Sequence, residues 1–184
     1  MRIIGGTHRS RKIDAPKNLP LRPTTDFAKE SLFNILENRF DFEKLSVLDL
    51  FSGTGAISYE FASRGAKKIV SVEKNLDAFK FIKQKSAEFG FANISVLKSD
   101  SFYYLDKCSE KFDIVFADPP YDMKGIEEIP GFVFKNNLLT PNGQLIVEHS
   151  RKINFEKAEQ FLEKRVYGDV NFSIFKINKP DEHE

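Results

Sequence analysis

The fold is decided by the stretch VLDLFSGTGA at positions 47–56, in which a short apolar run leads into a turn with two glycines and then into a helical pattern. Such runs are typical of strands that are buried on both faces of a parallel sheet. Four more apolar runs follow, with helical patterns between them, so the sequence predicts an α/β doubly wound domain with a mostly parallel sheet. The expected strands cover 47–51, 69–72, 94–97, 112–117 and 145–147, and the expected helices 56–63, 76–89, 101–107, 126–136 and 155–162.

The segment before this region has a different pattern. Gly5-Gly6 and three prolines interrupt any helical period within residues 1–23, which therefore predict an N-terminal extension with, at most, short strands. Capping side chains at Thr24-Thr25-Asp26 then begin a helix that ends near Asn38.

The segment after the alternating region predicts a terminal hairpin. Residues 165–167 and 172–177 have strand patterns and flank the turn residues Gly168-Asp169. The hairpin adds an antiparallel strand at the end of the sheet. We expect an N-terminal arm at 1–23 and one domain at 24–184.

Composition excludes several classes of protein. Of the 184 residues, 41% are hydrophobic and 30% charged, which is ordinary for a globular domain. No apolar run approaches the roughly 20 residues that cross a bilayer, and no signal-peptide pattern is present, so a cytoplasmic protein without membrane contact is expected. The single Cys108 and the three scattered histidines predict neither an internal disulfide nor a metal site.

Positive charge is concentrated at the N-terminus although the net charge is only +1. Six basic residues precede Thr24, against Asp14 as the single acid. Local charge density within a Debye length governs contact with phosphates, so the arm predicts a nucleic-acid interface. A solvated chain end is the alternative interpretation. The expected RNA-binding residues are Arg2, Arg9, Arg11, Lys12 and Arg22.

The carboxyl ends of the first three predicted strands carry residues suited to a nucleoside cofactor. Parallel sheets of this kind bind ligands at those ends. The position three residues after Gly55 is Ser58 and not the third glycine of a dinucleotide fingerprint, and the acid Asp49 before the turn suits a ligand with an amine. We predict that S-adenosylmethionine binds to Asp49, Phe51, Gly53, Gly55, Glu73, Asp100 and Ser101.

Two of these acids have individual expected roles. Glu73 lies 18 residues after Gly55, near the spacing at which a carboxylate binds both hydroxyls of a ribose. Asp100, beside Phe102, is expected to accept a hydrogen bond from an adenine amino group. Taken singly, each acid is also compatible with a solvated strand end or a helix cap.

The fourth predicted strand ends in Asp118-Pro119-Pro120-Tyr121, the most specific signal in the chain. The amino group of a nucleic-acid base is a poor nucleophile because its lone pair is delocalised into the ring. Acceptors for both of its N–H bonds localise that pair, and Asp118 and the Pro119 carbonyl are candidates. Tyr121 offers a face on which a displaced base can stack. We predict methyl transfer to an exocyclic amine, with Asp118, Pro119 and Tyr121 as the catalytic residues.

Together these motifs resemble the bacterial small-subunit (16S) ribosomal RNA guanine-N2 methyltransferase family, over nearly the whole chain. The resemblance rests on Arg2-Ile3-Ile4-Gly5-Gly6 with Arg9, Ser10 and Arg11, on Arg22-Pro23-Thr24, Phe33-Asn34 and the 49–55 loop, and on Ser63-Arg64-Gly65-Ala66, Glu73 and Asp118-Pro119-Pro120-Tyr121. It implies a Rossmann-like class I methyltransferase fold and methylation of N2 of a guanine in 16S ribosomal RNA or a small-subunit precursor.

The resemblance also implies cofactor contacts: Asp49 and the loop 53–55 for the methionine part, Glu73 for the ribose and Asp100 for the adenine. Some members of the family have alanine in place of Ser52 and serine in place of Thr54. The C-terminal strands depart most from the family pattern, which leaves their role open, and a monomer is expected.

Three other functions stay open at this point. A DNA adenine-N6 methyltransferase uses the same tetrapeptide, but 184 residues leave little room for a target-recognition insert. A nucleotide-dependent oxidoreductase fits Glu73, although the missing third glycine and the double proline count against it. A non-catalytic RNA-binding assembly module would need only the arm.

Overall fold

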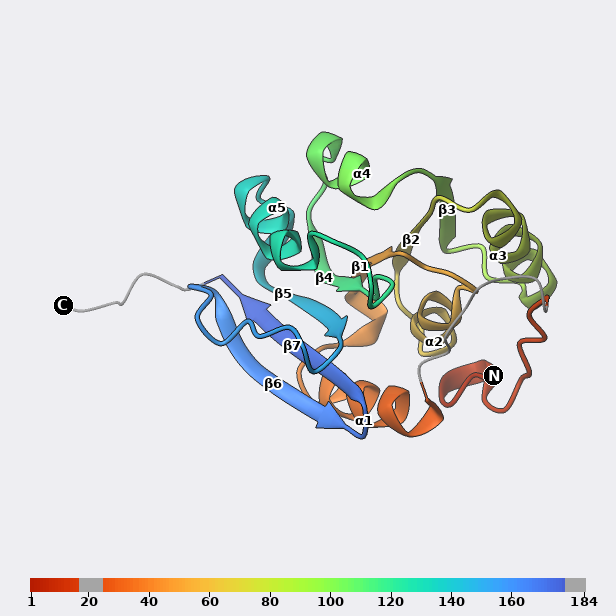
Figure 1. The fold of residues 1–184 in the computed structure, drawn as a ribbon. Helices are drawn as coiled ribbons and strands as arrows, with labels where there is room; N and C mark the ends of the chain where they lie inside the picture. Colours follow the sequence, from red (N-terminus) through yellow and green to blue (C-terminus); the bar gives the residue numbers. More distant parts are fainter. Residues whose placement is uncertain (17–24, 178–184) are drawn as a thin grey trace.

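The computed structural model describes residues 1–16 and 25–177, whose strands form one seven-stranded sheet in the order β3-β2-β1-β4-β5-β7-β6 (Figure 1). Strands β1 to β5 are parallel to one another, and β7 is antiparallel to both β5 and β6. The expected α/β architecture with an antiparallel terminal strand is therefore confirmed. The strands are β1 (Ser46–Leu50), β2 (Lys68–Glu73), β3 (Ile94–Lys98), β4 (Phe112–Ala117), β5 (Leu139–His149), β6 (Phe161–Tyr167) and β7 (Val170–Lys176).

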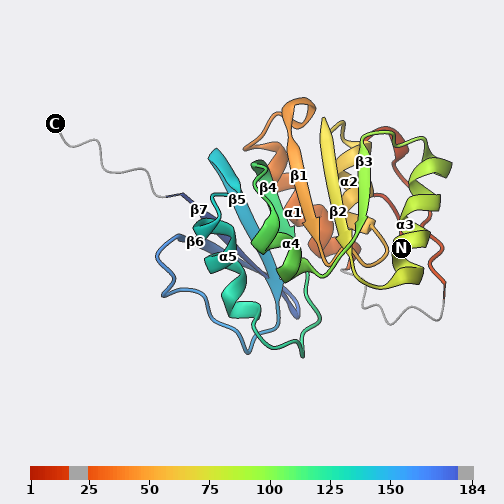
Figure 2. The same ribbon diagram turned by 90° about the horizontal axis from the view of Figure 1, so that it is seen from above.

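Helices cover both faces of the sheet (Figure 2). Because successive residues of a strand point to opposite faces, Val47 packs with the helices on one side and Leu48 with those on the other. The first layer contains α1 (Asp26–Glu37), α2 (Ala56–Ser63) and α3 (Leu76–Phe89), and the second contains α4 (Ser101–Lys107) and α5 (Ile129–Lys135). Short 3₁₀ turns lie at η1 (Gly6–His8), η2 (Phe42–Lys44) and η3 (Ile126–Glu128).

The helix expected at 155–162 is wrong, because the chain forms turns from Phe155 onward and β6 begins at Phe161. The Asn154 side chain accepts a hydrogen bond from the Glu156 amide at 2.8 Å, which stabilises a turn in place of a helix. Phe155 and Phe161 both contact Phe175 edge-on, with ring centroids 5.2 and 6.0 Å away. The apolar residues whose spacing suggested a helical face thus pack against β7 from a turn and a strand.

The described part of the N-terminal segment packs on the domain. Arg2 and Lys12 form an isolated antiparallel bridge, and Ile3 and Ile13 lie in the same core as α1 and α2. Gly6 has a φ of +72°, and a Cβ atom there would lie 1.9 Å from the Ser63 carbonyl oxygen. The close approach explains the glycine at this position. A division between an arm at 1–23 and a domain at 24–184 stays a prediction.

A buried ionic cluster fixes this segment. The Glu60 carboxylate on α2 accepts hydrogen bonds from the Ile4 and Gly5 amides, each at 2.8 Å. Lys29 Nζ lies 3.7 Å from the same carboxylate and donates to the Arg2 carbonyl, and Arg64 forms an ion pair with Glu60 at 2.8 Å. Burial lowers the pKa of Lys29, and the Glu60 charge opposes that shift.

Candidate active site

A cavity of about 430 Å³ lies at the carboxyl ends of β1, β2 and β4, where the sequence predicts the site. Its volume is within the range typical of small-molecule sites. It brings together Asp49, Phe51, Gly53, Glu73, Ser101, Asp118, Pro119 and Tyr121 from the predicted set, and its wall does not include Gly55 or Asp100.

The loop after β1 has an unusual backbone. Phe51 has a φ of +57°, in the left-handed region, and Gly53 and Gly55 have φ values of +55° and +79°. A non-glycine residue there costs roughly 1–2 kcal/mol, and such strain is concentrated at functional sites. A Cβ atom on Gly55 would lie 2.8 Å from the Tyr59 ring. Gly55 therefore allows the loop to pack on α2, while Gly53 faces the cavity.

Asp49 is a buried acid at the base of the cavity, with 1% of its surface exposed. Its Oδ2 accepts a hydrogen bond from the Ser58 hydroxyl at 2.5 Å, and Ser58 also hydrogen-bonds to Ser71. Burial raises the pKa of Asp49 to about 7, the hydroxyl of Ser58 opposes the shift, and the nearby Glu73 charge adds to it. A cationic amine in the cavity would stabilise the ionised carboxylate.

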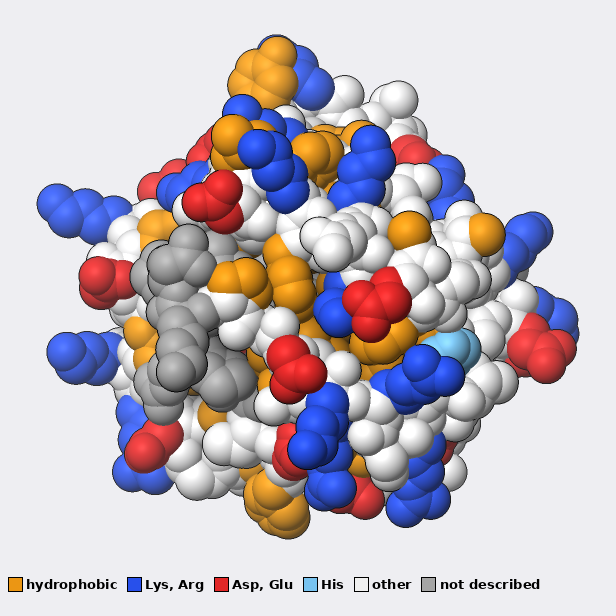
Figure 3. Space-filling view, turned by 90° about the vertical axis from the view of Figure 1, so that its right-hand side faces the viewer, with side chains coloured by type: hydrophobic (Ala, Val, Ile, Leu, Met, Phe, Trp, Pro, Cys, Tyr) orange, Lys and Arg blue, Asp and Glu red, His pale blue; other side chains and the backbone are white. Residues whose placement is uncertain are grey.

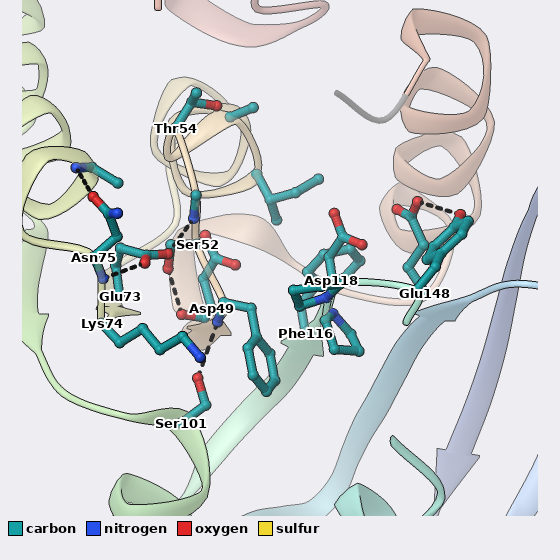
Figure 4. A pocket seen from close by; sticks show the side chains of 18 of the residues that line it. Asp49, Ser52, Thr54, Glu73, Lys74, Asn75, Ser101, Phe116, Asp118 and Glu148 are labelled. Carbon is teal, nitrogen blue, oxygen red and sulfur yellow. Dashed lines mark hydrogen bonds between the residues drawn. The ribbon is translucent and has the colours of Figure 1, made fainter. Parts of the chain in front are cut away.

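Glu73, at the end of β2, is held by two backbone amides. Its Oε2 accepts from Gly53 at 2.8 Å and its Oε1 from Asn75 at 2.7 Å. These bonds join the glycine loop to the start of α3, as Figure 4 shows. Each carboxylate oxygen can accept more than one hydrogen bond. The orientation of Glu73 is thus fixed before any hydroxyl-bearing ligand binds.

The third strand end differs from the sequence-based expectation. Asp100 caps α4, where its Oδ1 accepts from the Phe102 and Tyr103 amides at 3.0 and 3.2 Å, and it is exposed outside the cavity wall. The neighbouring Ser101 lines the cavity, and its hydroxyl accepts from the Phe51 amide at 3.3 Å. The assignment of Asp100 to adenine stays a prediction.

The fourth and fifth strands supply the other end of the cavity. Asp118 follows β4, and the Met123 amide donates to the Pro120 carbonyl at 2.9 Å, closing the turn of the double proline. The Tyr121 hydroxyl donates to Oε1 of Glu148 at 3.1 Å. In Figure 4, Asp118 lies between Glu148 and the group formed by Asp49 and Glu73.

Sequence reasoning missed Glu148, which lines the cavity near the end of β5. The signal was present, because an acid directly after the apolar run 145–147 occupies the same kind of strand end as Asp118. Met1 was also missed. It lines the cavity and its Sδ lies 3.5 Å from Thr54 Oγ1, which brings the N-terminal segment to the cavity rim.

Four of the predicted RNA-binding residues lie in the described part of that segment. Arg9, Arg11 and Lys12 are exposed, and Arg2 pairs with Asp26 at 2.9 Å. Arg22 lies outside the described residues. Figure 3 shows the side of the molecule that carries α3, with Lys and Arg side chains spread over it and Asp and Glu among them. Among the described residues on that face, the basic side chains form no continuous stripe.

Comparison with known proteins identifies the family. Residues 1–176 match the sequence profile of the family described as Conserved hypothetical protein 95. The chain belongs to this family. The match includes the N-terminal segment, the cavity and the terminal hairpin.

Relatives in this family have a described activity. A protein of Buchnera aphidicola is 30% identical over 154 residues, covering 84% of this chain and 78% of the relative. One of Escherichia coli K12 is 32% identical over 148 residues, covering 80% and 74%. Both are named Ribosomal RNA small subunit methyltransferase D. A solved structure of a hypothetical protein from Thermus thermophilus superimposes with a TM-score of 0.85 at 26% identity, covering 96% of this chain and 99% of that one.

The chain is therefore a methyltransferase with a Rossmann-like class I fold, and S-adenosylmethionine is its methyl donor. The sequence-based predictions of family, enzyme class and cofactor are confirmed, and the oxidoreductase and the non-catalytic module are set aside. The cavity fits this cofactor because a buried acid, Asp49, is available for a cationic amine and a fixed carboxylate, Glu73, for hydroxyl groups. Within the described ranges, no helix is both long and apolar enough to span a membrane.

Proposed function

We propose that this chain transfers a methyl group from S-adenosylmethionine to the exocyclic N2 amine of a specific guanine in 16S ribosomal RNA of the small ribosomal subunit. The observation that carries the proposal is the position of Asp118-Pro119-Pro120-Tyr121 in the same cavity as Asp49 and Glu73. The names of the relatives from Buchnera and Escherichia coli support the ribosomal RNA. The proposal includes a cytoplasmic monomer that acts on the RNA or on a subunit precursor.

The β1–β2 end of the cavity holds the cofactor in this proposal. Asp49 binds the amine of its methionine part, the loop with Phe51 and Gly53 approaches it closely, and Glu73 binds the ribose hydroxyls. Ser101, with Asp100 beside it, borders the adenine. When bound, the cofactor supplies an electrophilic methyl group on a positively charged sulfur, so the leaving group is neutral and orientation is the main requirement.

The β4 end activates the amine. The Asp118 carboxylate and the Pro119 carbonyl accept the two N–H bonds of the guanine amine, which directs its lone pair toward the methyl carbon. A carbon–nitrogen bond forms as the sulfur–carbon bond breaks, and the proton released from N2 passes to a carboxylate oxygen of Asp118. Tyr121 stacks on the base and keeps it out of water.

Substitution of Asp118 tests the catalytic assignment. Asp118→Ala is expected to lower kcat by roughly 10²–10⁴-fold, because one N–H of the amine loses its acceptor, and to leave cofactor affinity within severalfold. Methyl transfer into small-subunit ribosomal RNA from a deletion strain, with mass mapping of the modified nucleoside, measures the first effect, and calorimetry measures the second. Asp106→Ala, which removes an exposed acid at the end of α4, is the matched control.

Normal turnover of Asp118→Ala would remove the acceptor role. Methylation of adenine in DNA, with none in ribosomal RNA, would replace the proposed substrate with that of the alternative enzyme.

Removing charge from the N-terminal segment tests its contact with RNA. Arg9→Ala with Arg11→Ala is expected to weaken RNA binding at every sequence and to reduce the salt slope of log Kd by about 0.7–0.9 per lost phosphate contact. Lys67→Ala with Lys111→Ala is the control, because these exposed residues precede β2 and β4, at the ends of the strands remote from the cavity. Equal slopes for the two double variants would mean that the segment makes no phosphate contact.

A further inference from the structure

Asp118 and Glu148 occupy equivalent positions on neighbouring strands. Ala117, the last residue of β4, pairs in register with Val147 of β5, and each acid is the next residue along the chain. Neighbouring strands are about 4.8 Å apart, so the two acids leave the sheet side by side. Both line the cavity, and Figure 4 shows both of them facing it.

Glu148 is fixed within the sheet. Its side chain is almost wholly buried, with 3% of the residue exposed, and its strand lies between β4 and β7, where Glu148 pairs with Phe172. The hydroxyl of Tyr121 donates to Oε1 at 3.1 Å. This bond uses one of about four acceptor sites that a carboxylate has.

Two adjacent ionised carboxylates form a surface that accepts hydrogen bonds and donates none. Guanine presents two neighbouring donors on its Watson–Crick edge, the N2 amine and the N1–H. Adenine and cytosine place a ring nitrogen with a lone pair beside their amine. With such a base in the cavity, that lone pair would face a carboxylate and the two would repel each other.

We propose that Glu148 determines the base specificity of the enzyme by accepting the N1–H of guanine while Asp118 accepts from the N2 amine. The inference rests on the proposed function and adds to it the residue that distinguishes guanine from the other amino-bearing bases. Adenine and cytosine are rejected mainly because the Glu148 carboxylate would face the lone pair of their ring nitrogen. A penalty of this kind gives polar sites high selectivity.

The purely structural alternative is that Glu148 only orients the Tyr121 ring. The two roles differ in their dependence on the base. A residue that only orients the ring affects every stacked base alike, whereas one that reads N1–H affects the ratio between bases with and without that hydrogen.

The test compares guanine with 2-aminopurine, which keeps the 2-amino group but has a lone pair on N1. The substrate is the shortest fragment of 16S RNA that the wild type methylates, and ribosomal proteins are added if methylation requires them. Two forms of this RNA are prepared, with guanine or with 2-aminopurine at the mapped position. For the wild type we expect kcat/KM to favour guanine by roughly 100-fold or more. Glu148→Gln is expected to narrow that preference at least about 10-fold, since its amide both donates and accepts.

Tyr121→Phe is the matched variant, because it removes the hydrogen bond to Glu148 and keeps the ring. It is expected to leave the guanine preference within about threefold of wild type. For any variant too slow to assay, the ratio of Kd values for the two RNAs with S-adenosylhomocysteine present replaces the kinetic ratio. Comparing ratios cancels the intrinsic reactivity of the two amines.

An unchanged preference in Glu148→Gln, in an enzyme whose wild type methylates guanine N2, would overturn the role of Glu148 alone. An equal loss of preference in Tyr121→Phe would assign specificity to the Tyr121 hydroxyl and not to a contact between Glu148 and the base. A wild type that methylates no guanine N2 would instead overturn the proposed function and this inference with it.

Discussion

Glu60 and Asp49 are both buried acids. Glu60 lies on α2 and Asp49 is hydrogen-bonded to Ser58 of that helix, but the two differ in the groups that surround their carboxylate oxygens. Glu60 has no exposed surface and is bonded to two backbone amides, Lys29 and Arg64. Asp49 has the Ser58 hydroxyl as its side-chain donor, and burial raises its pKa to about 7. Both acids are removed from water, yet only Glu60 is paired with cations.

The difference separates a structural acid from a ligand-binding one. A buried carboxylate that is fully paired holds the fold together, and removing it leaves its partners without compensation. A buried carboxylate beside a cavity, with neutral donors and no cationic partner, is destabilising until a cation arrives. The contrast therefore predicts which acid stabilises the protein and which one binds the amine of the cofactor.

The largest expected effect is on folding. Glu60→Ala leaves two amides without their acceptor and takes a buried anion from Lys29 and Arg64, and is expected to lower the free energy of unfolding by about 3–5 kcal/mol. Chemical denaturation measures it. Glu37→Ala, which removes a half-exposed partner of Arg64, is the control and is expected to cost less than about 1 kcal/mol. Similar costs for the two variants would show that the buried cluster is not what fixes the N-terminal segment.

The next effect is on binding. Asp49→Asn is expected to weaken S-adenosylmethionine roughly 10- to 100-fold, because a charge-assisted bond to the amine is lost. The free energy of unfolding without ligand should stay equal or rise at pH 8, where the wild type buries a charge. Calorimetry and denaturation measure the two quantities, with the exposed Asp169→Asn as control. A marked loss of stability with unchanged affinity would place Asp49 in the same class as Glu60.

The smallest effect is on pH dependence. Since the folded pKa of Asp49, about 7, lies above its ordinary value of 3.8, its contribution to stability is full below about pH 4 and is lost as the pH rises through 7. Binding of a cation favours the ionised form, so up to about one proton should be released per cofactor bound at pH 6 and almost none at pH 8.5.

Calorimetry in buffers of different ionisation enthalpy measures that proton release. The Asp49→Asn variant should show less release at pH 6 than the wild type does. Identical release in the two proteins would assign the proton to another group.

Much of the fold is predictable because buried parallel strands leave a strong local pattern. The runs at 112–117 and 76–89 match β4 and α3 to the residue. The structure of the region after β5 was harder to predict, because the spacing of Phe155 and Phe161 is also typical of one face of a helix. Only their contacts with Phe175, which lies on β7, show that they pack as a turn and a strand.

The site was predictable where a strand end coincides with a distinctive motif, as at Asp49 and Asp118. Glu148 has no motif around it, and its position becomes meaningful only when the register of β4 and β5 is known. The docking of Ile4 and Gly5 on Glu60 depends on residues 55 or more positions apart, which no local pattern reveals.

The order of strands has a consequence for how the protein unfolds. Strands β1 and β4 are neighbours, and the Ser46 amide donates to Asp113 across a sequence separation of 67 residues. Closing so long a loop costs entropy, and pairings of this kind slow folding. The cavity lies at the boundary between these two strands, with Asp49 on β1 and Asp118 directly after β4. A bound cofactor that contacts both strands therefore stabilises the pairing of β1 with β4, which has the largest sequence separation among the parallel pairs. It is expected to lengthen the lifetime of the native state.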